Sequence, residues 1–121
     1  MALVVVQHRG PRGPVPEWMV AKLVKQLPWI VAEALDVEKN PDARIISNEI
    51  EVCVRESGEL DINTKDLEII IWANSYPERL ANLEQRKDEI LQDVRKFLGD
   101  HDRNLTGFVW VLLQPAAFGE L

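Results

Sequence analysis

The spacing of apolar residues along this 121-residue chain changes in the same order twice. In each half, a short run rich in β-branched residues precedes a longer segment that starts at a proline. That segment carries apolar residues every three or four positions, and a second short run follows it. The short runs predict strands and the longer segments predict amphipathic helices. The order is therefore β-α-β-β-α-β, with both halves in one domain of residues 1–121.

Four strands are expected, each bounded by turn residues. Val, Ile and Trp residues lie on both faces of these runs, and β-branched residues favour strands. The expected strands are residues 2–8 (ALVVVQH), 49–56 (EIEVCVRE), 67–74 (LEIIIWAN) and 107–114 (GFVWVLLQ). A strand, a helix and a strand joined by connections of this length suit parallel pairing within each half.

The first helix is expected from about Pro16 to Val37, with one apolar face. Pro28 lies inside this pattern, where it removes a backbone hydrogen bond, so we expect a kink or a restart there. The second helix is expected as one piece that ends at Gly99. Ser75 is its expected N-cap, in a capping box with the glutamate three residues later.

The pattern predicts an α+β fold, a four-stranded sheet with two helices on one face. Because each helix has a single apolar face, both can cover the same side of the sheet. The other side would then be an open apolar face, and such a patch usually marks self-association. Two folds share this element order, the ferredoxin-like split β-α-β fold and the tautomerase fold, and element order alone does not separate them.

Composition excludes several classes of function. The net charge of −6 disfavours binding to nucleic acid, which requires clustered Lys and Arg. One cysteine, Cys53, and two histidines provide no disulfide and no His-rich or Cys-based metal site, so no metal or other cofactor is expected. No run reaches the ~18 apolar residues of a membrane helix, and the N-terminus lacks the basic lead of a signal peptide. We therefore expect a cytoplasmic protein without membrane contact.

Four features together resemble the tautomerase superfamily, which includes 4-oxalocrotonate tautomerase and macrophage migration inhibitory factor (MIF). The first strand begins at the start of the chain, and an Arg-bearing loop, RGPRGPVP, joins it directly to an amphipathic helix. The second half repeats this plan as LEIIIWANSYPERL and its helix. The chain ends in FVWVLLQPAAFGEL, which is similar to the closing strand and aromatic tail of small bacterial members.

This resemblance implies a homotrimer and a specific chemistry. In the family the initiator methionine is removed, and the proline that follows acts through its amine as a general base on an enol or keto acid, in a pocket at a subunit boundary. Arginines bind the carboxylate of the substrate. The physical basis is a base whose pKa is near the working pH, with cations placed where negative charge develops.

The sequence departs from the family at the catalytic position, where Ala2 replaces the proline. If Met1 is removed, the primary amine of Ala2 is the candidate catalytic group. If Met1 is retained, ordinary tautomerase chemistry should be absent.

The candidate substrate-binding residues are four arginines, chosen because a guanidinium can pair with a carboxylate through two hydrogen bonds. They are Arg9, Arg12, Arg79 and Arg55. The alternative is that these are ordinary loop and helix-end charges.

Three functions stay open at this point. The first is an isomerase or tautomerase of small unsaturated or keto acids. The second is a binding or structural protein of the same fold without catalysis. The third is a ferredoxin-like small-ligand regulatory module, which predicts an antiparallel sheet and a dimer.

Overall fold

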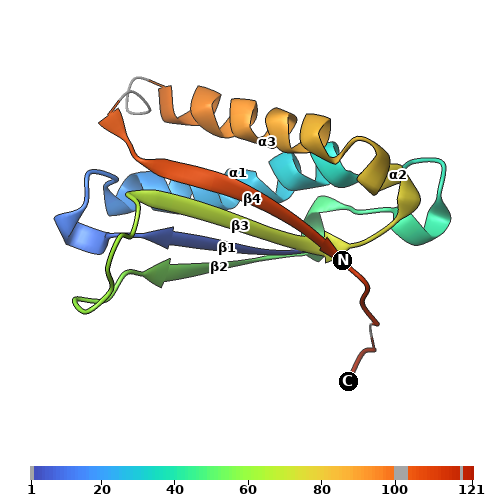
Figure 1. Cartoon of the computed structure of the whole chain (residues 1–121), viewed down its shortest axis with the longest axis horizontal. Coiled ribbons are helices and arrows are strands. Elements are labelled where there is room, and N and C mark those ends of the chain that lie inside the picture. Colours follow the sequence, from blue (N-terminus) through green and yellow to red (C-terminus); the bar gives the residue numbers. More distant parts are fainter. Residues whose placement is uncertain (1, 100–103, 118) are drawn as a thin grey trace.

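A computed structural model of the chain describes residues 2–99, 104–117 and 119–121, apart from the side chain of Arg12. The helices cover one face of a four-stranded sheet (Figure 1). The strands are β1 (Ala2–His8), β2 (Ile50–Glu56), β3 (Leu67–Asn74) and β4 (Gly107–Gln114). The α-helices are α1 (Glu17–Leu35), α2 (Pro77–Ala81) and α3 (Leu83–Leu98). Short 3-10 turns are η1 (Gly10–Arg12), η2 (Pro41–Ala43) and η3 (Ser47–Glu49). This is the predicted α+β architecture.

The strand order across the sheet is β2-β1-β3-β4. Strands β1 and β2 are parallel, and so are β3 and β4, which confirms parallel pairing within each half. The halves meet where β1 runs antiparallel to β3. The ferredoxin-like alternative is wrong, because it predicted an antiparallel sheet and each half instead pairs its own two strands in parallel.

Helix α1 continues through Pro28, so the predicted restart is wrong. Leu27 and Val31, on either side of the proline, are fully buried against the sheet, as is Leu23 one turn earlier. The burial of this continuous apolar face offsets the backbone hydrogen bond that the proline removes. The helix ends at Leu35, two residues before the predicted end.

The second helix is divided, which corrects the single helix predicted from the sequence. Asn82, with φ −134° and ψ 36°, separates α2 from α3. The N-cap of α2 is Tyr76, without a side-chain cap hydrogen bond, so the capping box at Ser75 is also wrong. The predicted stop is confirmed, because α3 ends at Leu98 and Gly99 follows with φ +58°.

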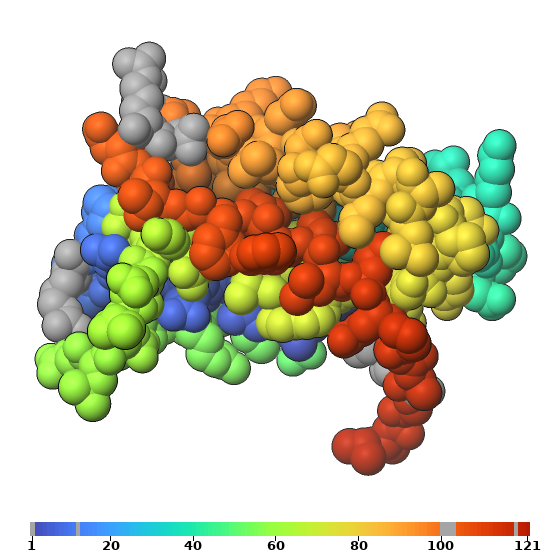
Figure 2. Space-filling view, viewed as in Figure 1, coloured from blue at the N-terminus to red at the C-terminus, as the bar shows by residue number. Residues whose placement is uncertain are grey.

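The core lies between the sheet and the helices. Alternate strand residues, such as Val4, Val6 and Ile71, are fully buried against α1 and α3. The opposite face of the sheet is open and apolar, as predicted. Its exposed large side chains include Leu3, Trp110 and Leu112. The last residues of the chain leave β4 and project away from the body (Figures 1 and 2). In the part of the chain that the structure describes, no helix has the length and apolar character needed to cross a membrane.

The loop that follows α1 is fixed by the carboxylate of Asp36. One oxygen, Oδ1, accepts a hydrogen bond from Arg44 Nε at 2.9 Å and another from the backbone N–H of Ile45 at 2.8 Å. Burial raises the pKa of Asp36, but these hydrogen bonds and the charge of Arg44 outweigh burial and hold the pKa below its ordinary value. The ionised carboxylate therefore stabilises the folded loop.

Replacing this carboxylate should change how stability depends on pH. A lowered folded pKa means that Asp36 stabilises the protein above about pH 4, and that this contribution disappears as the pH falls through the folded pKa. We expect Asp36→Asn to lose about 1–2 kcal/mol of unfolding free energy at pH 7 and less at pH 2, measured by urea unfolding. Asp93→Asn, at an exposed position of α3, is the control. A loss at Asp36 that is the same at both pH values would contradict this account.

Candidate functional site

A groove lies at the end of the sheet where β1 and β2 begin and β3 and β4 end. This juxtaposition follows from the topology, because β1 is antiparallel to β3 and each is parallel to its own partner. The groove has a volume of about 540 Å³. Its lining residues are Ala2, Leu3, Val5, Glu51, Trp72, Ala73, Asn74, Gln114, Ala116 and Ala117. In Figure 1, the N-terminal end lies beside the ends of β3 and β4.

The walls of the groove are mainly apolar, with a few polar groups. Leu3 lies between Glu51 on β2 and Trp72 on β3 in the strand register, and all three face the open side of the sheet. Asn74 pairs with Gln114 at the end of the next strand. The groove therefore offers one carboxylate and two amides to a ligand, beside an aromatic and aliphatic surface.

Ala2 is the candidate catalytic residue, and it is 3% exposed at the start of β1. It lies on the wall of the groove. Met1, on whose removal the free amine depends, lies outside the described residues.

Arg9 and Arg55 lie at the opposite end of the sheet. The seven residues of β1 separate Ala2 from His8 by roughly 20 Å. Beyond His8, Arg9 donates a hydrogen bond from Nη2 to the carbonyl of Thr64 at 2.6 Å, and its Nε lies 3.4 Å from Oδ1 of Asp66. Within one protomer, neither arginine reaches the groove at Ala2.

Arg55 faces the solvent near the end of β2, where it pairs with Gln7 in the register of the strands. Its Nη1 donates a hydrogen bond to the carbonyl of Val54 at 3.0 Å. The backbone of Arg12 lies in η1, at the same end of the sheet, and its side chain is outside the described part of the chain.

Arg79 is 1% exposed, and its guanidinium is hydrogen-bonded to backbone carbonyls. Its Nε donates to the carbonyl of Leu35 at 2.8 Å, Nη1 to Asn74 at 2.9 Å and Nη2 to Ala43 at 2.6 Å. Burial lowers the pKa of Arg79, and the positive charge of Arg86 lowers it further. These contacts give Arg79 a part in holding the fold together, because its guanidinium joins three separate segments.

His8 is buried and has a structural contact. The backbone N–H of Gly10 donates to His8 Nδ1 at 3.0 Å, so a neutral ring carries its proton on Nε2. This hydrogen bond fixes the sharp turn at the end of β1, where Gly10 has φ +68°. Among the described residues, no group of three His, Cys, Asp or Glu side chains is placed to hold a metal ion.

Sequence reasoning missed the polar groups of the groove. Glu51, Asn74 and Gln114 stand at polar positions of alternating strands, and that alternation does mark them as residues of the open face. What brings them to Ala2 is the pairing of four strands, which no local pattern contains.

No protein-family model matches this sequence, and no curated protein matches it either. Several solved structures are similar to it. The symmetric trimer of a wild-type fused 4-OT is 15% identical with a TM-score of 0.55, over 93% of this chain and 85% of that chain. A MIF-like protein from Entamoeba histolytica is 10% identical with a TM-score of 0.55, over 94% of this chain and 89% of that one.

A third similar structure is N1, a member of the cis-3-chloroacrylic acid dehalogenase family. It is 14% identical with a TM-score of 0.55, over 98% of this chain and 82% of that chain. At these identities the likeness establishes the fold. The fold is that of tautomerase and MIF structures, and the resemblance predicted from the sequence is confirmed at this level.

The contacts of Arg79 predict that a lysine cannot replace it. Lysine keeps the charge but cannot donate in three fixed directions, so buried carbonyls lose their partners. We expect Arg79→Lys to lower the free energy of unfolding by about 3 kcal/mol, measured by urea unfolding. Arg55→Lys, at an exposed strand end, should change it by less than about 0.5 kcal/mol. Equal effects of the two substitutions would contradict a structural role for Arg79.

Proposed function

We propose that this protein assembles into a homotrimer through the open face of its sheet and binds a small carboxylate in the groove at Ala2. The observation that carries the proposal is the position of that groove, at the start of β1 and beside an exposed apolar face. The proposed place of action is the cytoplasm, and no nucleic acid or membrane takes part.

The open face supports self-association because several of its large apolar side chains stay partly exposed within the protomer. Trp110 is 54% exposed and Leu112 is 38% exposed, on strand β4. Leu3 pairs with Trp72 in the strand register, which extends the patch across the sheet. Contiguous exposed apolar surface of this kind marks protein contacts. The similar fused 4-OT structure is itself a symmetric trimer.

The proposed assembly also determines which residues would bind the carboxylate. Glu51 is the charged residue that lines the groove among the described residues, and it would repel an anion. The candidate arginines Arg9, Arg12 and Arg55 lie at the far end of the sheet. In the proposed trimer, an arginine from a neighbouring copy supplies the missing positive charge, so the site is complete only in the assembly.

The proposed chemistry is proton transfer by the amine of Ala2, after removal of Met1. An α-amino group has a reference pKa of about 8, and an apolar groove lowers the pKa of an amine. A lowered pKa leaves a neutral amine that can take a proton from a carbon next to a carbonyl, with the arginine stabilising the negative charge that develops. The proposed substrates are small unsaturated or keto acids.

A second function is favoured by one observation, the alanine at position 2. A primary amine replaces the secondary amine that the tautomerase superfamily uses. The same trimer and groove can then serve as a binding site without turnover. The two functions differ in activity and share the assembly.

The assembly predicts a clear difference between two exposed tryptophans. Trp110 lies on the open sheet face and Trp18 lies on α1, with similar exposures of 54% and 57%. We expect wild type and Trp18→Glu to have three times the 13.8 kDa chain mass by light scattering. Trp110→Glu should give monomers, because it buries a charge at the contact. A monomeric wild type, or a trimeric Trp110→Glu variant, would contradict the proposed interface.

Catalysis is tested by the residue at position 2. The intact mass of protein expressed from its own start shows whether Met1 is removed, and ketonisation of phenylenolpyruvate measures activity on the same sample. We expect wild type without Met1 to turn over the substrate, and Ala2→Pro to raise kcat/KM by about 100-fold or more. Arg12→Ala should abolish the activity of both.

Each other outcome of this assay has a definite meaning. Activity in Ala2→Pro alone supports the groove and identifies the natural protein as a binding member of the fold. Inactivity of both proteins, each shown to be folded and trimeric, would refute the catalytic proposal and leave the binding or structural function.

A further inference from the structure

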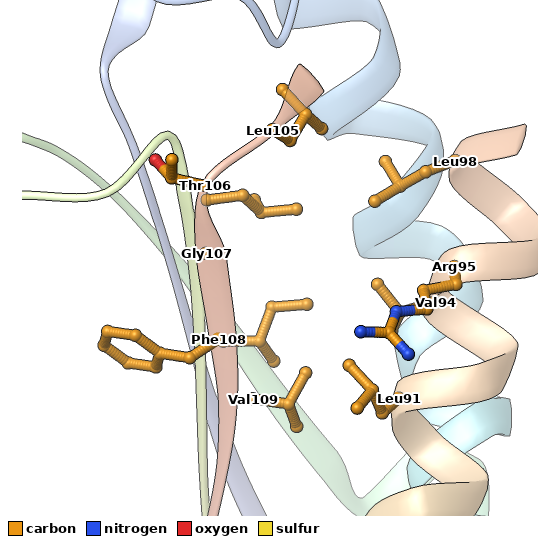
Figure 3. A pocket seen from close by; sticks show the side chains of 11 residues that line it. Leu91, Val94, Arg95, Leu98, Leu105, Thr106, Gly107, Phe108 and Val109 are labelled. Atoms are coloured by element: carbon orange, nitrogen blue, oxygen red, sulfur yellow. The ribbon is translucent and has the colours of Figure 1, made fainter. Parts of the chain in front are cut away.

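A second cavity lies on the other side of the sheet, between α3 and β4 (Figure 3). Its volume is about 170 Å³. Helix α3 contributes side chains at spacings of three, four and seven residues, namely Leu91, Val94, Arg95 and Leu98. Strands β3 and β4 and the residues before β4 form the opposite wall. The cavity shares no lining residue with the groove at Ala2, so it is a separate site.

One of the lining residues is a glycine, Gly107, which stands in a row of inward-facing residues. Gly107 pairs with Leu67, and the next pair of the same row is Val109 with Ile69. Three of these positions bring an aliphatic side chain beneath α3, and Gly107 brings none. An added Cβ at Gly107 would lie 2.2 Å from the carbonyl oxygen of Leu67, so the backbone of β3 excludes any side chain at this position.

The side chains that line the cavity are mainly aliphatic, with Thr106 and Phe108 among them, and the charge is confined to one residue. Leu91 and Leu98 face Val109 and Leu105 across the gap, and the guanidinium of Arg95 reaches into it from α3 (Figure 3). Arg95 is the charged residue among the described residues that line the cavity. A guanidinium has five N–H donors, so Arg95 can keep another partner and still bind an anion.

The size and chemistry of the cavity define a ligand. A cavity of roughly 150 Å³ lined by aliphatic side chains is large enough for benzene. A ring or a branched chain of that size fits among Leu91, Val94 and Leu98. A carboxylate attached to it would meet Arg95, whose planar fork matches the two oxygens.

We propose that the cavity between α3 and β4 binds a small monocarboxylate with an apolar body about the size of a benzene ring. The apolar body lies against the leucines of α3, and the carboxylate pairs with Arg95. This site is independent of the groove at Ala2 and of any activity there.

The test uses benzoate as the probe and amide chemical shifts as the readout. Titration into the isotope-labelled protein should produce saturable shifts at Leu98, Gly107 and Val109, with a Kd of about 1 mM. Benzamide, a neutral molecule of the same shape, should bind at least about 10-fold more weakly. Shifts confined to Trp72, Asn74 and Gln114 would place the ligand in the other groove and overturn the proposal.

Two variants test separately how the charge of Arg95 and the apolar space contribute to benzoate binding. Arg95→Gln should weaken benzoate by about 10-fold or more, while Lys96→Gln, the adjacent basic residue of α3, should leave its Kd unchanged. Leu91→Phe, at a half-buried position of the wall, should occupy the space and abolish the shifts at Gly107. Each variant is first shown to be folded by circular dichroism. Unchanged binding in both Arg95→Gln and Leu91→Phe, or no saturable shift in wild type, would overturn the proposal.

Discussion

The buried guanidinium of Arg79 is the interaction on which the arrangement of the two halves depends. Among the described residues, no carboxylate accepts a hydrogen bond from it. Instead, carbonyls from the end of α1, the end of β3 and the η2 turn each receive one of its hydrogen bonds. The carbonyl of Leu35 is one of those that the end of a helix leaves without an internal partner. A buried charge is costly unless it is fully hydrogen-bonded, so the three acceptors and the cation require one another. Arg86 reinforces the same helix end, since its Nη1 donates to the carbonyls of Ala34 and Asp36.

Arg79 also helps to position the groove at Ala2, which it does not itself line. Arg79 donates a hydrogen bond to the backbone carbonyl of Asn74. Asn74 is the last residue of β3 and lines the groove at Ala2. One more backbone bond, from the N–H of Ser75 to the carbonyl of Gln114 at 2.9 Å, fixes the end of β4 beside it. The sequence marked Arg79 as a residue that would contact a ligand. Its contacts make it a residue that holds the wall of the groove in place.

Periodicity predicted the strands, the helix-covered face and the open face, because these depend on local alternation and on a single apolar stripe. It failed at Ser75 and Asn82, where tertiary contacts decide. Arg79 and Arg86 tie α2 and α3 to the end of α1, and Nε of Arg86 donates to Oδ1 of Asn82 at 2.6 Å, at the break between them. Burial of Arg79 had no local signal, since its neighbours in the segment PERL are mostly polar or exposed. Similarly, Glu51 lies near Ala2 because β1 pairs with β2, in a register that joins residues 48 positions apart in the sequence.

The two halves share one plan, but the starts of their first strands are held differently. The start of β3 corresponds to the start of β1, and it is closed by Asp66. The carboxylate of Asp66 accepts a hydrogen bond from the backbone N–H of Thr106 at 2.9 Å, and its other oxygen lies 3.4 Å from Nε of Arg9. These contacts fasten the loop before β4 to the arginine loop after β1. At the start of β1 there is no such residue among those described, and the equivalent space is the groove. The two halves therefore differ in structure at these points, because a carboxylate ties the start of β3 to neighbouring loops and the start of β1 borders the groove.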